Sequence, residues 1–181
     1  MKHLLDLQNS FILLVDVQER LLPSMHASEQ VLKDIETLLS AGKMLDISMV
    51  SCEQYPKGLG NTVSALQEFQ TKDIYEKTIF SACGNASLVE EIKSINKKQC
   101  VICGIETHVC ILQSVSDLLD EGYEVFIPYE TVSSRTLQNK NLALDRMRSW
   151  GAQITSLEQV FFEWLKDAKN PKFKEIASLI K

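Results

Sequence analysis

The chain has 181 residues, of which 45% are hydrophobic, and it carries a formal net charge of −5. A chain of this length can bury most of its apolar surface in one core, so we expect a single domain over residues 1–181. The acidic balance offers no electrostatic attraction to nucleic acid or to an anionic membrane surface, and we expect neither as a partner.

Strand-like and helix-like patterns alternate along the whole chain. Six strands are expected, at Phe11–Val15, Ile47–Ser51, Lys77–Phe80, Gln99–Cys103, Tyr123–Pro128 and Gln153–Thr155. The first, second, fourth and fifth are nearly continuous apolar runs, which is typical of strands covered on both faces. The alternation predicts an α/β fold, a three-layer doubly wound sheet of about six mainly parallel strands in the order 3-2-1-4-5-6, with helices on both faces.

Apolar stripes at helical spacing lie between these strands. In the stripe over residues 31–45, Ser28 is expected to cap the N-terminus of the helix. The stripe over residues 111–119 is ended by Gly122. Pro171 is expected at the first position of a last helix, where a missing N–H is tolerated.

Two reactive side chains follow strands that the predicted order makes neighbours. Asp16 comes directly after the first strand, and Cys110 lies in the first turn of the helix after the fourth. Ligands bind beyond the carboxyl ends of such strands, so we expect both groups in one crevice. The helix dipole favours thiolate, the nucleophilic form, but moves a thiol pKa by only roughly one unit. Full activation of Cys110 therefore needs a base or a cation nearby, and Asp16 is the candidate.

The odd number of cysteines, five, is not typical of a disulfide framework and predicts reduced thiols in the cytoplasm. Cys100 and Cys103 form a C-x-x-C pattern, which suggests redox chemistry. Residues three apart on a strand point to opposite faces, however, so we favour core packing for both. Nothing in the sequence marks Cys52 or Cys83 as reactive.

Lysine and histidine residues give weaker indications of a functional role. Lys77 enters a short apolar strand, which is unusual for a solvated lysine. The three histidines, His3, His26 and His108, are scattered without metal-ligand spacing, so we expect no metal and no other cofactor. His108 can line the crevice, although a histidine at a helix start is more often merely solvated.

Three motifs occur in order along the chain: Leu14-Val-Asp16-Val-Gln18, Lys77 with Phe80-Ser81, and Gly104-Ile-Glu-Thr-His-Val-Cys110. Together they resemble the isochorismatase-like cysteine hydrolases, a superfamily that includes the nicotinamidases. The resemblance covers essentially the whole chain. The segment Gln54-Tyr-Pro-Lys-Gly-Leu-Gly60 is similar to the sequences of the isochorismatase-domain-containing branch of this superfamily.

This resemblance implies a hydrolase that cleaves an amide-like C–N bond of a small molecule through a covalent intermediate on Cys110. It implies a triad in which Asp16 takes the thiol proton, while Lys77 holds the carboxylate and supports the thiolate. It also implies an oxyanion hole made by the backbone N–H groups of Glu106 and Cys110, beside a cis peptide bond between Ile105 and Glu106.

The resemblance further implies that Gln18, Phe80 and His108 line the substrate and that the protein forms a homo-oligomer. Nicotinamidases bind a metal through an aspartate and several histidines after the second strand. Residues 53–60 contain no histidine, so a metal-free enzyme is expected.

Two other functions remain open. One is a thiol redox protein that uses Cys100 and Cys103, which requires a reversible disulfide between them. The other is a non-catalytic interaction protein on the same fold, and the complete set of Asp16, Lys77 and Cys110 weighs against it.

Overall fold

The computed structural model describes residues 4–70 and 74–180 of the protein. Its centre is a seven-stranded sheet whose named strands pair in parallel, in the order β3-β2-β1-β4-β5-β7, with β6 beside β4. The strands are β1 (Ser10–Val15), β2 (Ser48–Gln54), β3 (Tyr75–Lys77), β4 (Gln99–Ile105), β5 (Glu124–Pro128), β6 (Val132–Ser133) and β7 (Gln153–Thr155). The predicted order is confirmed, with β7 in the sixth place, and β6 is an additional short strand.

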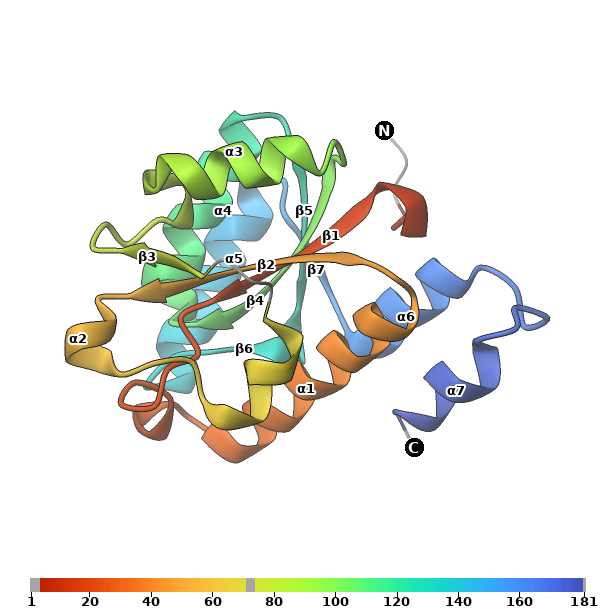
Figure 1. The fold of residues 1–181 in the computed structure, drawn as a ribbon, viewed down its shortest axis with the longest axis horizontal. Coiled ribbons are helices and arrows are strands. Elements are labelled where there is room, and N and C mark those ends of the chain that lie inside the picture. Colours follow the sequence, from red (N-terminus) through yellow and green to blue (C-terminus); the bar gives the residue numbers. More distant parts are fainter. Residues whose placement is uncertain (1–3, 71–73, 181) are drawn as a thin grey trace.

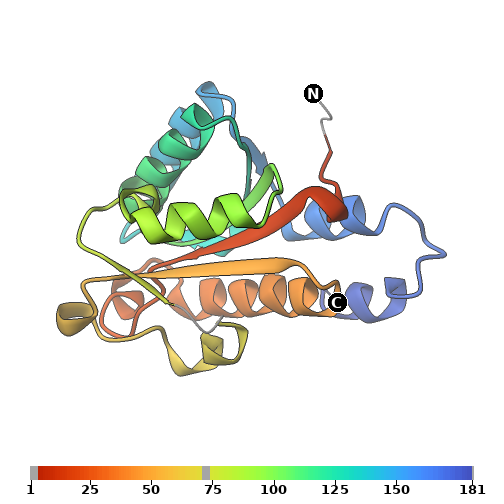
Figure 2. The same cartoon turned by 45° about the horizontal axis from the view of Figure 1, so that its top comes forward.

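Helices cover both faces of this sheet, as Figures 1 and 2 show. They are α1 (Ser28–Met44), α2 (Pro56–Leu59), α3 (Ala86–Ser94), α4 (Leu112–Asp120), α5 (Leu137–Ser149), α6 (Leu157–Leu165) and α7 (Phe173–Ser178). Apolar residues of α1, α6 and α7 belong to one core, and those of α3, α4 and α5 belong to the other. The predicted three-layer architecture is therefore confirmed. Within the described ranges, no helix is both long and apolar enough to cross a membrane.

Strand β1 contributes apolar side chains to both hydrophobic cores, which explains its apolar run. Phe11, Leu13 and Val15 belong to the core under α3, α4 and α5. Ile12 and Leu14 belong to the core under α1 and α6. Because each face of the strand is buried, the residues from Phe11 to Val15 are all apolar, and Asp16 follows directly after the strand.

The boundaries of β3 differ from the expectation. Lys77 ends this strand, whereas the sequence pattern placed it at the start of a strand over residues 77–80. After β3, side chains form hydrogen bonds with the backbone carbonyl groups. Gln54 Nε2 donates to Thr78 O, and Lys77 Nζ donates to Phe80 O. These carbonyls are thereby bound to side chains at the point where the chain leaves the sheet.

Two helix starts also differ from the expectation. Ser28 is the first residue of α1, not its cap, because Ala27 precedes it with φ 51° and no side chain caps this end. Pro171 lies before α7, which begins at Phe173. There the Asn170 side chain accepts the Lys172 N–H at 2.9 Å and forms a turn before the helix.

Gly104 allows β1 and β4 to meet closely at their carboxyl ends. Its φ is +123°, and a Cβ at this position would lie 2.0 Å from the carbonyl oxygen of Val15. Only glycine fits such a backbone conformation and such a contact. The segments that follow the two strands, with Asp16 and Cys110, therefore begin side by side.

Candidate active site

Three segments at the carboxyl edge of the sheet bring Asp16, Lys77 and Cys110 together. Asp16 follows β1 with φ 55°, and Lys77 ends β3. Cys110 lies in a π-helical turn, Thr107–Ile111, that leads into α4. All three residues are buried, Cys110 with 5% of its surface exposed. The shared location that the sequence predicted for Asp16 and Cys110 is therefore present, with Lys77 as a third member.

The ammonium group of Lys77 is fully engaged. Its Nζ lies 2.6 Å from Asp16 Oδ2, 2.7 Å from Gln54 Oε1 and 2.9 Å from the carbonyl oxygen of Phe80. A lysine has three N–H donors, so each has one acceptor. Lys77 is thus placed to anchor Asp16 and to supply positive charge.

Asp16 receives donors on both carboxylate oxygens. Cys52 Sγ lies 3.4 Å from Oδ1, and the thiol of Cys110 also interacts with this carboxylate. Burial raises the pKa of Asp16, and the opposing effects of Lys77 and of these thiols do not cancel it. Burial would lower the pKa of Lys77, but the charge of Asp16 together with the smaller effects of Cys52 and Cys110 outweighs it, and this pKa is raised. At neutral pH Lys77 is therefore an ammonium group beside a carboxylate that accepts a proton readily.

The environment of Cys110 disfavours the charged form of its thiol. Burial, together with the Asp16 carboxylate, raises the pKa of the Cys110 thiol to about 12, and the opposing charge of Lys77 is smaller. The charge of Lys77 alone therefore does not keep Cys110 as a thiolate. At neutral pH the thiol of Cys110 is therefore protonated.

Gln18, which is expected to line the substrate, has a structural role in this fold. It is fully buried, and both ends of its amide bind backbone. Its Nε2 donates to the carbonyl oxygens of Gln54 and Gly60, and its Oε1 accepts the N–H of Gln54. Gln18 therefore fixes the loop after β2 against the loop after β1.

The other expected lining residues are accessible. Phe80 is 51% exposed and adjoins the segment that carries Lys77. His108 lies in the same turn as Cys110, and its Nδ1 is 2.9 Å from Ser134 Oγ. Both can meet a ligand that approaches from solvent.

The peptide bond between Ile105 and Glu106 is cis, as the resemblance implies. The Glu106 carboxylate accepts hydrogen bonds from the backbone N–H of Arg135 at 3.2 Å and from the side-chain Nε–H of Arg135 at 3.1 Å. The side chain of Glu106 is therefore held by Arg135.

Cys100 and Cys103 do not form a pair. Both are fully buried and free. Cys100 belongs to the core under α3, α4 and α5, whereas Cys103 belongs to the core under α1 and α6. Since their side chains lie on opposite faces of the sheet, a disulfide between them is sterically excluded in this fold.

No group of three or more His, Cys, Asp or Glu side chains suited to a metal ion occurs among the described residues. Glu53, in the segment where metal-dependent relatives carry ligands, accepts the Thr62 N–H at 2.6 Å and the Thr62 hydroxyl at 2.8 Å. His3 lies outside the described residues.

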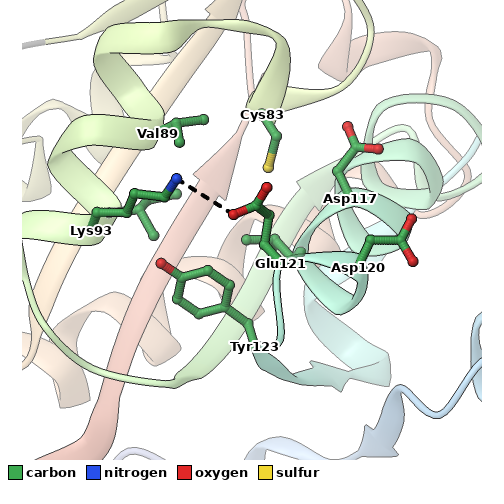
Figure 3. Close-up of a pocket in the computed structure, with 9 residues that line it drawn as sticks. Cys83, Val89, Lys93, Asp117, Asp120, Glu121 and Tyr123 are labelled. Atoms are coloured by element: carbon green, nitrogen blue, oxygen red, sulfur yellow. Dashed lines mark ion pairs between the residues drawn. The ribbon is translucent and has the colours of Figure 1, made fainter.

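A cavity of about 250 Å³ lies elsewhere, between α3 and α4. Figure 3 shows Cys83, Asp117 and Tyr123 on its wall, with the Lys93–Glu121 ion pair at 3.4 Å. Burial raises the pKa of Cys83 to about 11, and the Asp117 charge adds to this. None of the triad residues lines this cavity.

Sequence reasoning missed two residues that contact Asp16 and Lys77. Gln54 is paired in register with Lys77, and Cys52 is paired in register with Val15, the residue before Asp16. Their positions depend on strand register, and the sequence signal was only that both lie near the carboxyl end of the second predicted strand.

Comparisons with known proteins give one consistent answer. The profile of the isochorismatase domain matches residues 4–159. The secreted isochorismatase effector Isc1 of Phytophthora sojae is 38% identical over 179 residues, covering 96% of this chain and 85% of that protein. Isochorismatase domain-containing protein 2 of Xenopus laevis is 39% identical over 174 residues, covering 96% and 84%.

A solved structure has the same fold as this protein over nearly the whole chain. The structure named MAR1 ribonuclease from Caenorhabditis elegans superposes with a TM-score of 0.91 at 32% sequence identity. The match covers 97% of this chain and 91% of that one. The arrangement of strands and helices described above is therefore shared with it.

Proposed function

The chain belongs to the isochorismatase family, whose fold is that of a hydrolase, and we propose that it is a cysteine hydrolase that cleaves an amide-like C–N bond of a small molecule. In this proposal Asp16, Lys77 and Cys110 form one catalytic triad. The observation that carries it is the buried carboxylate of Asp16, which lies 2.6 Å from Lys77 Nζ and interacts with the Cys110 thiol.

The first step forms a bond between Cys110 Sγ and the substrate carbonyl carbon. The thiol proton moves to Asp16 as this bond forms, because the raised pKa of the carboxylate makes it the available base. The carbonyl oxygen becomes an oxyanion, for which the backbone N–H groups of Glu106 and Cys110 are the proposed donors. When the C–N bond breaks, the leaving nitrogen takes the proton from Asp16.

The second step returns the enzyme to its thiol form. Water attacks the thioester carbon and gives one proton to Asp16, and the departing Cys110 sulfur takes that proton back. The net reaction adds one water and yields a carboxylic acid and an amine or ammonia. Lys77 stays protonated throughout, since its three donors hold Asp16, Gln54 and the Phe80 carbonyl in place.

The remaining features of the proposal follow from the composition of the chain and of the site. We propose no metal and no organic cofactor, a small-molecule substrate, and a homo-oligomer. Free cysteines in a chain of this length favour the cytoplasm as the compartment. With a net charge of −5 the chain carries no excess of positive charge for nucleic acid, so we do not propose RNA as the substrate.

The test is a screen of small amides, ureides and carbamoyl compounds that detects released ammonia or amine, combined with intact-mass detection of an acyl group on Cys110. We expect Cys110→Ser to lower kcat by a factor on the order of 10⁴ or more, since loss of a nucleophile from a catalytic unit has effects of this size. Cys83→Ser, which changes a cysteine outside the triad, is the matched control and should keep full activity.

Two results would contradict this function. One is turnover of a substrate by Cys110→Ser at the wild-type rate. The other is cleavage of a labelled RNA that persists in the Cys110→Ser variant, which would favour the activity named for the Caenorhabditis elegans neighbour.

A further inference from the structure

Cys52 contacts the same carboxylate as the catalytic groups. Its Sγ lies 3.4 Å from Asp16 Oδ1, while Lys77 Nζ lies 2.6 Å from Oδ2. The Asp16 N–H also donates to the Cys52 carbonyl oxygen at 3.1 Å. The parallel register of β1 and β2, which pairs Cys52 with Val15, produces both contacts.

The thiol of Cys52 is the donor in this contact. It is buried at 1% exposure, and burial, together with the Asp16 charge, raises its pKa well above the usual value. It therefore stays protonated over the whole neutral range, and the ionised carboxylate is the acceptor. Because substrate has no access to it, Cys52 is not a second nucleophile.

A single partner does not fix a carboxylate. The terminal torsion of an aspartate side chain is broad, so an ion pair at Oδ2 alone leaves the plane of the Asp16 carboxylate free to rotate. A second donor at Oδ1 restricts that rotation and also favours the charged form. The thiol of Cys52 is such a donor, supplied by a different strand from that of Lys77.

We propose that Cys52 is a positioning residue, whose S–H bond to Asp16 Oδ1 orients the carboxylate toward Cys110 and keeps it ionised for proton transfer. This inference rests on the proposed function, in which Asp16 accepts the proton of Cys110. It adds a fourth residue, and a second thiol, to the machinery of that reaction.

The proposal has a consequence for pH dependence. The titratable groups that face Asp16 are Lys77 from β3, Cys52 from β2 and Cys110 from the π-helical turn. The hydrogen bond from Cys52 lowers the pKa of Asp16 and so opposes the effect of burial. Without it, Asp16 binds a proton at higher pH, and the pH at which Cys110 becomes reactive rises with it.

The test measures the rate of alkylation of Cys110 by iodoacetamide from pH 4 to 9, by peptide mass spectrometry, and needs no substrate. The acid limb of this profile reports the macroscopic pKa of the Asp16–Cys110 pair. We expect Cys52→Ala to move the limb upward by about half a pH unit to one unit, the effect of losing a weak hydrogen bond to a charge. Cys52→Ser, which keeps a donor, should stay near the wild-type position.

Cys100→Ala is the matched control. It removes a fully buried thiol from the same core as Cys52, on a strand position far from Asp16, and should leave the limb unchanged. If thermal melting shows that Cys52→Ala does not fold, the pair Cys52→Val and Cys52→Thr makes the same comparison, since these side chains differ mainly by a hydroxyl donor.

The outcomes separate this inference from the proposed function. If Asp16→Asn leaves the alkylation profile of Cys110 unchanged, Asp16 is not its base and the proposed function fails. If Asp16→Asn changes the profile but the variants without a donor at position 52 match Cys100→Ala, only the role of Cys52 is overturned.

Discussion

Lys77 stabilises the buried site through charge as well as through hydrogen bonds. Its ammonium group links Asp16 after β1, Gln54 of β2 and the Phe80 carbonyl after β3. Removal of one partner of a buried ion pair leaves the other as an uncompensated charge. The same residue that supports the proposed chemistry should therefore also carry a large part of the local stability.

We predict that Lys77→Met lowers the free energy of unfolding by about 3–5 kcal/mol at pH 8, measured by urea denaturation. The deficit should shrink at pH 5. Without the ammonium group the raised pKa of Asp16 rises further, so the carboxylate becomes neutral in the folded variant as the pH falls and the penalty of an unpaired charge is lost.

Lys43→Met is the control for this prediction. Lys43 also forms an ion pair, with Glu68 at 2.9 Å, but both side chains are exposed. Its loss should change stability by less than about 1 kcal/mol. Equal effects of the two substitutions would mean that the Lys77–Asp16 pair contributes no more than a surface pair.

At the scale of the elements, the close approach of β1 and β4 decides where the site residues lie. Gly104 permits it, since a Cβ there would meet the Val15 carbonyl oxygen at 2.0 Å. Backbone atoms of two hydrogen-bonded parallel strands cannot move aside as a flexible side chain can. The geometry of this contact therefore also controls the turn that carries Cys110.

We predict that Gly104→Ala costs at least about 3 kcal/mol of stability, because a strained φ adds to overpacking against backbone. Gly122→Ala is the control, since Gly122 has φ +79° but no atom within 4 Å of its added Cβ. It should cost only roughly 1–2 kcal/mol, the price of a left-handed conformation. Chemical denaturation measures the free energy of unfolding of both variants. Similar losses of stability would show that a small backbone shift relieves the contact with Val15.

At the scale of the whole molecule, large apolar side chains remain exposed. Ile79, Phe80 and Leu142 are each more than half exposed. Two of them follow Lys77 directly, so a surface next to the site is apolar. Such surfaces are commonly covered by another protein chain.

We predict that the protein is a homo-oligomer and that Ile79→Lys weakens its assembly, because a charge at this surface must be desolvated when chains associate. Light scattering coupled to size-exclusion chromatography measures this against the chain mass of 20.5 kDa. A matched substitution at an exposed position of α1, Glu29→Lys, should leave the mass unchanged. A wild-type protein that is monomeric at all concentrations would contradict the prediction.

Much of the architecture was determined by the sequence alone. Continuous apolar runs alternate with helical stripes, which restricts the chain to a parallel sheet covered on both faces. The strand order then followed from the doubly wound pattern, and with it the meeting of Asp16 and Cys110 at neighbouring strand ends. Opposite faces for Cys100 and Cys103 followed from the two-residue period of a strand.

Only the tertiary structure decided which groups surround Asp16 and in which charge state they rest. Cys52 and Lys77 are 36 and 61 residues from Asp16 in the chain, so their contacts depend on strand register. The burial that raises the pKa of Cys110 depends on packing by distant elements. Local patterns indicate which segments form strands, but strand register and desolvation are properties of the assembled core.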